Sequence, residues 1–203
     1  MTNLLSQRAQ WILLAIMTLM IIVTRYNHFF SQTLLADATW AAFFIAGLVL
    51  SSRLAPMVLI IEVLAIDLGW RILSGTASEN SCVSAAYPFL IVAYGSLWVL
   101  GRLTAKLADM SLKGLAVTYA GLTTGVLSSF AISNTAWYAF SGQYDAMPVL
   151  EFTEKVSPYF FSFLQGAAFW VTLSVAVWFI LSKVVTRNST LSKVVTRNST
   201  QFN

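Results

Sequence analysis

The sequence has little that could form a conventional active site or a water-facing surface. It has one cysteine and one histidine in 203 residues, and charged residues make up only 10% of it. A lone cysteine cannot form an internal disulfide or a multi-cysteine metal cage. Because soluble proteins carry about a quarter charged residues, this chain has too little polar material to cover a surface in water.

Motifs of soluble catalysis are also missing. The sequence contains no Gly-x-x-x-x-Gly-Lys-Ser/Thr loop, and so no ATP site is expected, and it contains no Gly-x-Ser-x-Gly elbow. The net charge of +4 arises from basic residues spread along the chain at the ends of apolar segments. This distribution is typical of membrane topology, and no nucleic-acid partner is predicted.

What the chain does have is apolar material, at 58% hydrophobic residues and a mean hydropathy of +0.74. This composition predicts an all-α integral membrane protein with lipid as its main surroundings. A helix needs about 20 apolar residues to cross a bilayer. Six transmembrane helices are predicted, and the first is retained because no cleavage site follows it. The predicted spans are 7–25, 34–52, 56–73, 84–103, 114–137 and 157–182.

The basic residues predict that both termini are cytoplasmic. An inside N-terminus puts nine Lys and Arg residues on the cytoplasmic side and three, namely Arg25, Arg71 and Lys155, on the outer side. A transmembrane domain is thus expected over 1–182, with a cytoplasmic tail over 183–203. The tail includes most of a decamer, 181–190, that is repeated at 191–200. Either a native duplication or an artefact of the sequence would produce it, and it carries no functional inference.

This topology collects the unusual polar residues on the outer side, so any ligand site is expected to open outward. The group is Arg25, His28, Asp37, Arg71, Asn80, Cys82, Asp145, Glu151 and Glu154.

Two acidic residues lie inside the third predicted span. Because an ionisable group in a membrane is costly, it is a functional hypothesis by default. Asp67 is four residues before Arg71, on the same helical face, so one interpretation is an Asp67–Arg71 ion pair that only holds the helix. The other is that Asp67 faces an outward cavity and binds a polar ligand. Glu62 lies about 140° around the helix from Asp67 and is expected to face a different neighbour.

Cys82 lies in a polar loop, Ser78-Glu79-Asn80-Ser81-Cys82-Val83-Ser84, between two apolar segments. A lone cysteine is usually a buried apolar filler. Hydroxyl, amide and carboxylate neighbours instead favour an accessible thiol that can act as a soft ligand or nucleophile. The only histidine, His28, follows the first span and is predicted to lie on the same side.

With these features the chain resembles the BtuM family of cobalamin (vitamin B12) transporters, solitary relatives of the S-components of energy-coupling-factor transporters. The resemblance covers about residues 5–182. It rests on six spans, an outward site, the segment Asn80-Ser81-Cys82-Val83-Ser84-Ala85-Ala86-Tyr87-Pro88-Phe89, Asp67 in Ile66-Asp67-Leu68-Gly69-Trp70, and His28.

The resemblance implies a six-helix S-component-like bundle in the bacterial inner membrane, with a periplasm-facing pocket for cobalamin. It implies that the Cys82 thiolate ligates the corrinoid cobalt and promotes decyanation of cyanocobalamin, so that the chain is primarily a transporter with an associated cysteine-mediated activity. The pocket residues that it implies beside Cys82 are His28, Asp67, Arg71, Asn80 and Tyr87.

One feature departs from the wider S-component pattern. The first span lacks the Ala-x-x-x-Ala docking pair, since Ala9 is followed by Leu13 and Ala15 by Leu19. The expected partners are therefore cobalamin and membrane lipids, without an obligatory energising module. A periplasmic B12-delivery protein is compatible with this expectation.

Two other hypotheses about the function remain open. Cys82, His28 and an arginine such as Arg71 could form a membrane cysteine transpeptidase or protease of the exosortase type, with a thiolate nucleophile and a histidine base. A structural subunit without a site would explain the hydrophobicity but not the one-sided polar group.

Overall fold

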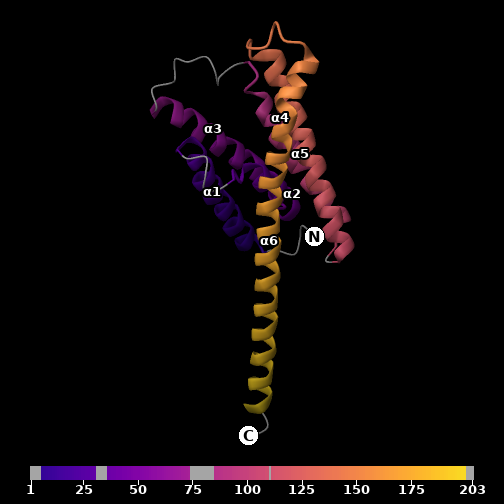
Figure 1. The fold of residues 1–203 in the computed structure, drawn as a ribbon. Coiled ribbons are helices and arrows are strands. Elements are labelled where there is room, and N and C mark those ends of the chain that lie inside the picture. The colour runs from indigo at the N-terminus through magenta and orange to yellow at the C-terminus, as the bar shows by residue number, and fades with distance from the viewer. Residues whose placement is uncertain (1–5, 31–35, 74–84, 110, 200–203) are drawn as a thin grey trace. The chain divides into compact units, whose positions relative to one another are not determined.

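The computed structural model describes residues 6–30, 36–73, 85–109 and 111–199, without the side chains of 26–30, 71 and 180–199. These residues form helices and no strand, as the composition predicted (Figure 1). The helices are α1 (Gln7–Phe30), α2 (Thr39–Val49), α3 (Ala55–Leu73), α4 (Phe89–Leu107), α5 (Leu112–Phe140) and α6 (Val149–Ser199).

Among the described residues, four stretches are long and apolar enough to cross a membrane: Gln7–Arg25, Phe89–Leu107, Leu112–Phe140 and Val149–Phe179. Large apolar side chains stay exposed along them, such as Leu19 at 61% and Phe179 at 57%. Lipid is the solvent that accommodates such a surface, so the chain is a helical membrane protein.

The helix found within the predicted span 34–52 is shorter than that span. Its helix, α2, has 11 residues, which at 1.5 Å per residue gives about 16 Å, roughly half of a 30 Å hydrocarbon core. Every residue from Thr39 to Gly47 is buried. The apolar character that predicted a lipid-facing span instead reflects packing inside the protein. The predicted span over 56–73 forms α3, which has 19 residues but carries Glu62, Asp67 and Arg71.

Helix α1 has one buried face and one exposed face, and both are apolar. Leu14, Met17, Ile21 and Thr24 are buried at helical spacing, whereas Ile12 is 61% exposed. This buried stripe packs against α2 and α3 and ends at Arg25. The packing thereby positions one charged side chain at the end of an apolar interface.

Helices α2 and α4 approach each other closely at two glycines. A Cβ at Gly47 would overlap the carbonyl oxygen of Trp98, and one at Gly101 would overlap that of Phe44. Gly121 and Gly125 lie on α5 against α4, where added Cβ atoms would meet the side chains of Thr104 and Leu97. Small residues here allow close helix contact, as expected in membranes.

Two compact units are present, residues 1–168 and 169–203. Helix α6 begins in the first unit, where Phe163 stacks on Trp40 of α2 with ring centroids 4.6 Å apart. Its backbone stays helical to Ser199, through most of the predicted 183–203 tail.

Candidate functional site

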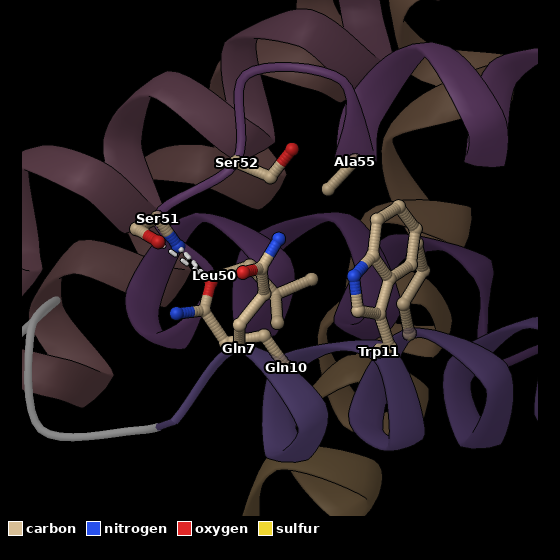
Figure 2. Close-up of a pocket in the computed structure, with 8 residues that line it drawn as sticks. Gln7, Gln10, Trp11, Leu50, Ser51, Ser52 and Ala55 are labelled. Atoms are coloured by element: carbon tan, nitrogen blue, oxygen red, sulfur yellow. Dashed lines mark hydrogen bonds between the residues drawn. The ribbon is translucent and has the colours of Figure 1, made fainter.

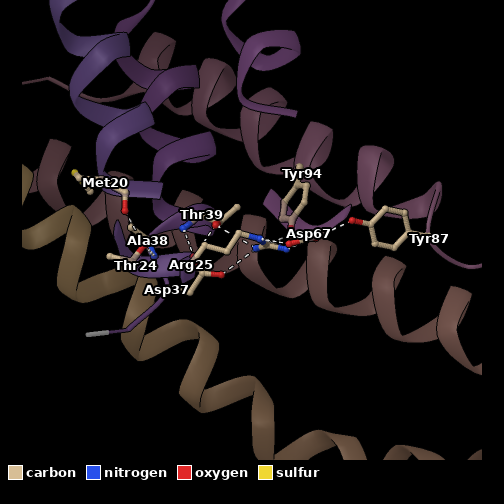
Figure 3. A network of polar contacts seen from close by, with 9 residues as sticks. All are labelled: Met20, Thr24, Arg25, Asp37, Ala38, Thr39, Asp67, Tyr87 and Tyr94. Carbon is tan, nitrogen blue, oxygen red and sulfur yellow. Dashed lines mark hydrogen bonds and ion pairs between the residues drawn. The ribbon is translucent and has the colours of Figure 1, made fainter. Parts of the chain in front are cut away.

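Arg25 is the centre of a buried polar network at one end of the α1–α3 interface (Figure 3). Its Nε donates to Asp67 Oδ1 at 2.6 Å, and its Nη2 donates to Asp67 Oδ2 at 2.7 Å. This fork geometry is the strongest arrangement that an arginine and a carboxylate can make. Both side chains are 12% exposed, so the pair is largely withdrawn from solvent.

The third guanidinium nitrogen connects Arg25 to α2 and α4. Arg25 Nη1 donates to Asp37 Oδ2 at 3.1 Å, Thr39 Oγ1 at 3.3 Å and Tyr94 Oη at 3.5 Å. Tyr94 is itself held by stacking on Phe43, with ring centroids 4.8 Å apart. One arginine thus links α1 to the next three helices.

Local hydrogen bonds fix the start of α2 beside this arginine. Asp37 Oδ1 accepts from the Thr39 backbone N–H at 2.9 Å and from Thr39 Oγ1 at 2.5 Å. On α1, Thr24 Oγ1 accepts from the Ala38 N–H at 3.0 Å and donates to the Met20 carbonyl at 2.8 Å. Asp37 therefore satisfies an otherwise unpaired donor of the first helical turn while presenting its other oxygen to Arg25.

Tyr87 extends the network to the turn that precedes α4. Its hydroxyl donates to Asp67 Oδ2 at 2.8 Å. Burial, followed by the hydrogen bond to Asp67, raises the pKa of Tyr87 well above its ordinary value of 10. The phenol therefore remains a donor at any physiological pH.

The network combines one guanidinium with two carboxylates, so with all three ionised it has a surplus of one negative charge. Asp37 is its most exposed carboxylate, at 22%. Such a site suits a ligand with N–H donors, because carboxylates accept hydrogen bonds and Tyr87 fixes one of them. In the part of the chain that the structure covers, no group of three His, Cys, Asp or Glu could hold a metal.

Of the site residues predicted from the sequence, the structure brings Asp67 and Tyr87 together. Arg71 lies on α3 and His28 on α1, but their side chains are outside the described part. Asn80 and Cys82 are outside the described residues altogether. The partners found for Asp67 are Arg25 and Tyr87, so this carboxylate ties separate segments together and is more than a brace within α3.

Sequence reasoning placed Arg25 and Asp37 on the outer side but did not give them a role in the site. It missed Thr39 and Tyr94. The available signal was charge of opposite sign at the ends of neighbouring apolar segments, since buried charges in membranes are normally paired.

A cavity of about 300 Å³ lies at the opposite end of α1 (Figure 2). Gln10 and Arg25 are 15 residues apart, about 22 Å along a helix. Ser51 donates to Gln10 Oε1 through its N–H at 3.0 Å and its hydroxyl at 2.6 Å. The lining residues are Gln7, Gln10, Trp11, Leu14, Leu50, Ser51, Ser52 and Ala55.

Replacing Tyr87 with phenylalanine is expected to lower the free energy of unfolding by about 1.5–3 kcal/mol, the range for a hydrogen bond to a charged group. The change removes only the hydroxyl that donates to Asp67. Denaturant unfolding of the purified protein in detergent measures the loss. Tyr159→Phe is the matched control, because Tyr159 is 62% exposed and should tolerate the change. Equal losses in the two variants would contradict a specific role for the Tyr87 hydroxyl.

Comparison with protein-family models and with curated proteins finds no match for this chain.

Proposed function

We propose that this chain binds cobalamin and carries it across the bacterial inner membrane. The observation that supports this most is the hydrogen bond between Asp67 and Tyr87, at 2.8 Å, inside a buried polar network of an otherwise apolar protein. Tyr87 follows Cys82 by five residues. The proposal therefore combines the Asp67–Tyr87 hydrogen bond with the nearby sequence segment that contains Cys82, the only cysteine.

The chemistry of the network suits a corrinoid. A corrin ring carries several amide side chains on a large apolar framework, and its pocket needs a few polar groups on apolar walls. The carboxylates of Asp37 and Asp67 would accept from amide N–H groups. Under this proposal His28, Arg71 and Asn80 complete the pocket, and Tyr87 positions Asp67.

Cys82 would be the axial ligand of the corrinoid cobalt. Ligation requires the thiolate, and the metal itself favours loss of the thiol proton. Electron donation from sulfur weakens the bond on the opposite face of the cobalt. Cyanide bound there would leave with its bonding electron pair and take up a proton, and the oxidation state of the cobalt would not change.

The proposed topology is a six-helix S-component-like bundle with both termini cytoplasmic and the Arg25 network toward the periplasm. The short helix α2 is compatible with this, because it is buried among other helices and need not span lipid by itself. The absence of an Ala-x-x-x-Ala pair in the first span favours action without an energising module.

The test is the visible spectrum of protein purified after growth with cyanocobalamin. A corrinoid is expected to co-purify with the parent, and Cys82→Ser is expected to change its spectrum because oxygen replaces sulfur at the metal. Cys82→Ala should also reduce growth of an uptake-deficient bacterium at limiting vitamin. Equal growth with the parent and Cys82→Ala would show that the thiol is not needed for uptake.

A control separates this proposal from the transpeptidase reading. Colourless protein that forms a covalent adduct with a peptide thioester, lost in Cys82→Ser, would support a cysteine nucleophile and reject cobalt ligation. The Lys155→Met variant, which changes an exposed ion pair remote in sequence from the site, should bind corrinoid like the parent.

A further inference from the structure

Glu62 is the eighth residue of α3, with apolar residues on both sides of it in the helix. Both of its carboxyl oxygens are buried and have no hydrogen bond of normal geometry among the described residues. The side chain of Thr18 on α1 faces the carboxyl group. Leu59 and Val63, on the same side of α3, are fully buried, whereas Ile61 is 65% exposed. The carboxyl group therefore faces protein and not lipid.

In the described part of the chain, no basic side chain is paired with Glu62. Helices α1, α2 and α4 pack against α3, and α2 has no ionisable residue. Within the described part, Arg25 is bound to Asp37 and Asp67, and Arg102 donates to the Leu50 carbonyl at 2.6 Å. None of the described ion pairs involves Glu62. The other ionisable groups on these elements are Arg8, Tyr26 and His28 on α1, Asp67 and Arg71 on α3, and Tyr94 and Lys106 on α4.

An unpaired carboxylate in apolar surroundings is so costly that the group takes up a proton instead. A metal cation is a poor alternative ligand, because hard cations require several oxygen donors. Among the described residues, no group of three His, Cys, Asp or Glu includes Glu62, and the Thr18 hydroxyl faces its carboxyl group. The proton is therefore the ligand that this position suits.

Glu62 also has a particular place along the α1–α3 interface. Trp11 on α1 and Ala55 on α3 line the cavity. Thr18 and Glu62 each follow seven residues later on the same two helices. Further along, Arg25 of α1 binds Asp67 of α3. At 1.5 Å per residue, Glu62 lies about 10 Å from Ala55 and about 7.5 Å from Asp67 along the helix. Along the α1–α3 interface, Glu62 therefore lies between the cavity and the Arg25 network.

We infer that Glu62 is a proton-binding site within the membrane domain, between the cavity and the Arg25 network, and that its proton exchange drives transport. Intramembrane carboxylates of pumps and transporters form proton relays of this kind. Only the coupling to transport rests on the proposed function. Proton binding by Glu62 is independent of it.

Dicyclohexylcarbodiimide tests proton binding, since it modifies protonated carboxyl groups in apolar surroundings. In full-length protein in lipid nanodiscs, mass spectrometry is expected to find the adduct on Glu62, forming faster at acidic than at alkaline pH. Glu62→Gln should lose this adduct. Glu151, which is exposed and paired with Lys155, should remain unmodified. An unmodified Glu62, or modification independent of pH, would overturn the inference.

Coupling is tested in proteoliposomes with cyanocobalamin outside and a pH gradient. Uptake by the parent is expected to follow the gradient, and Glu62→Gln should lose that dependence while binding cobalamin like the parent. Parent uptake that ignores the gradient would reject coupling. If the parent binds no cobalamin, the proposed function fails, whereas the carbodiimide result on Glu62 still decides proton binding.

Discussion

Arg25→Met is expected to lower the free energy of unfolding by about 3–5 kcal/mol, the usual cost of removing one partner from a buried ion pair. Asp37 and Asp67 would then lie close together without the guanidinium that separates and neutralises them. The same variant should lose corrinoid binding under the proposed function, because Arg25 orients both carboxylates. Denaturant unfolding in detergent and the spectrum of co-purified corrinoid measure the two effects.

Two further variants make this prediction specific. Lys155→Met breaks the exposed pair with Glu151, whose side chains are 56% and 51% exposed, and should cost less than about 1 kcal/mol. Asp67→Asn in the Arg25→Met background should recover part of the lost stability, since it removes an uncompensated charge. If Arg25→Met were no more destabilising than Lys155→Met, the Arg25 network would not act as a buried connection between helices.

Gly47→Ala and Gly101→Ala are expected to reduce the free energy of unfolding by about 1–3 kcal/mol each, or to prevent folding, because they overfill a close helix contact. The atoms that an added Cβ would meet are backbone carbonyl oxygens of the opposite helix, which cannot rotate away as a side chain can. Thermal unfolding monitored by circular dichroism in detergent gives the comparison.

Gly95→Ala is the matched control on the same helix, α4. A Cβ at Gly95 would have no neighbour within 4 Å. Alanine is favoured over glycine in helices by up to about 1 kcal/mol, so this variant should be neutral or slightly stabilising. Similar destabilisation at Gly95 and Gly101 would contradict close α2–α4 contact as the cause.

Hydropathy predicted the long helices well because their exposed faces are as apolar as their buried faces. It predicted 114–137 and 157–182 where α5 and α6 occur, although both helices extend further. It was wrong about the length of the helix within 34–52. A run of apolar residues gives the same hydropathy whether lipid or protein surrounds it. Burial separates these cases, and it depends on contacts between distant segments.

Part of the candidate site could be predicted from the sequence. Asp67 stood out because a charge in an apolar span is costly, and Tyr87 was implied by the family resemblance. The pairing of Asp67 with Arg25 joins residues 42 positions apart. Helical spacing pointed instead to Arg71, a neighbour within α3. Spacing identifies which residues share a face of one helix, but it does not identify what a second helix brings to that face.

The short helix α2 has a consequence for how the chain is made. At about 16 Å it cannot reach across the bilayer alone, so during synthesis it would be a poor signal for the machinery that inserts membrane segments one at a time. The segment over 39–49 must enter together with a longer neighbour, and α4, which it meets through Gly47 and Gly101, is translated about 50 residues later. Assembly of the bundle therefore depends on helices that are made after α2 has left the ribosome.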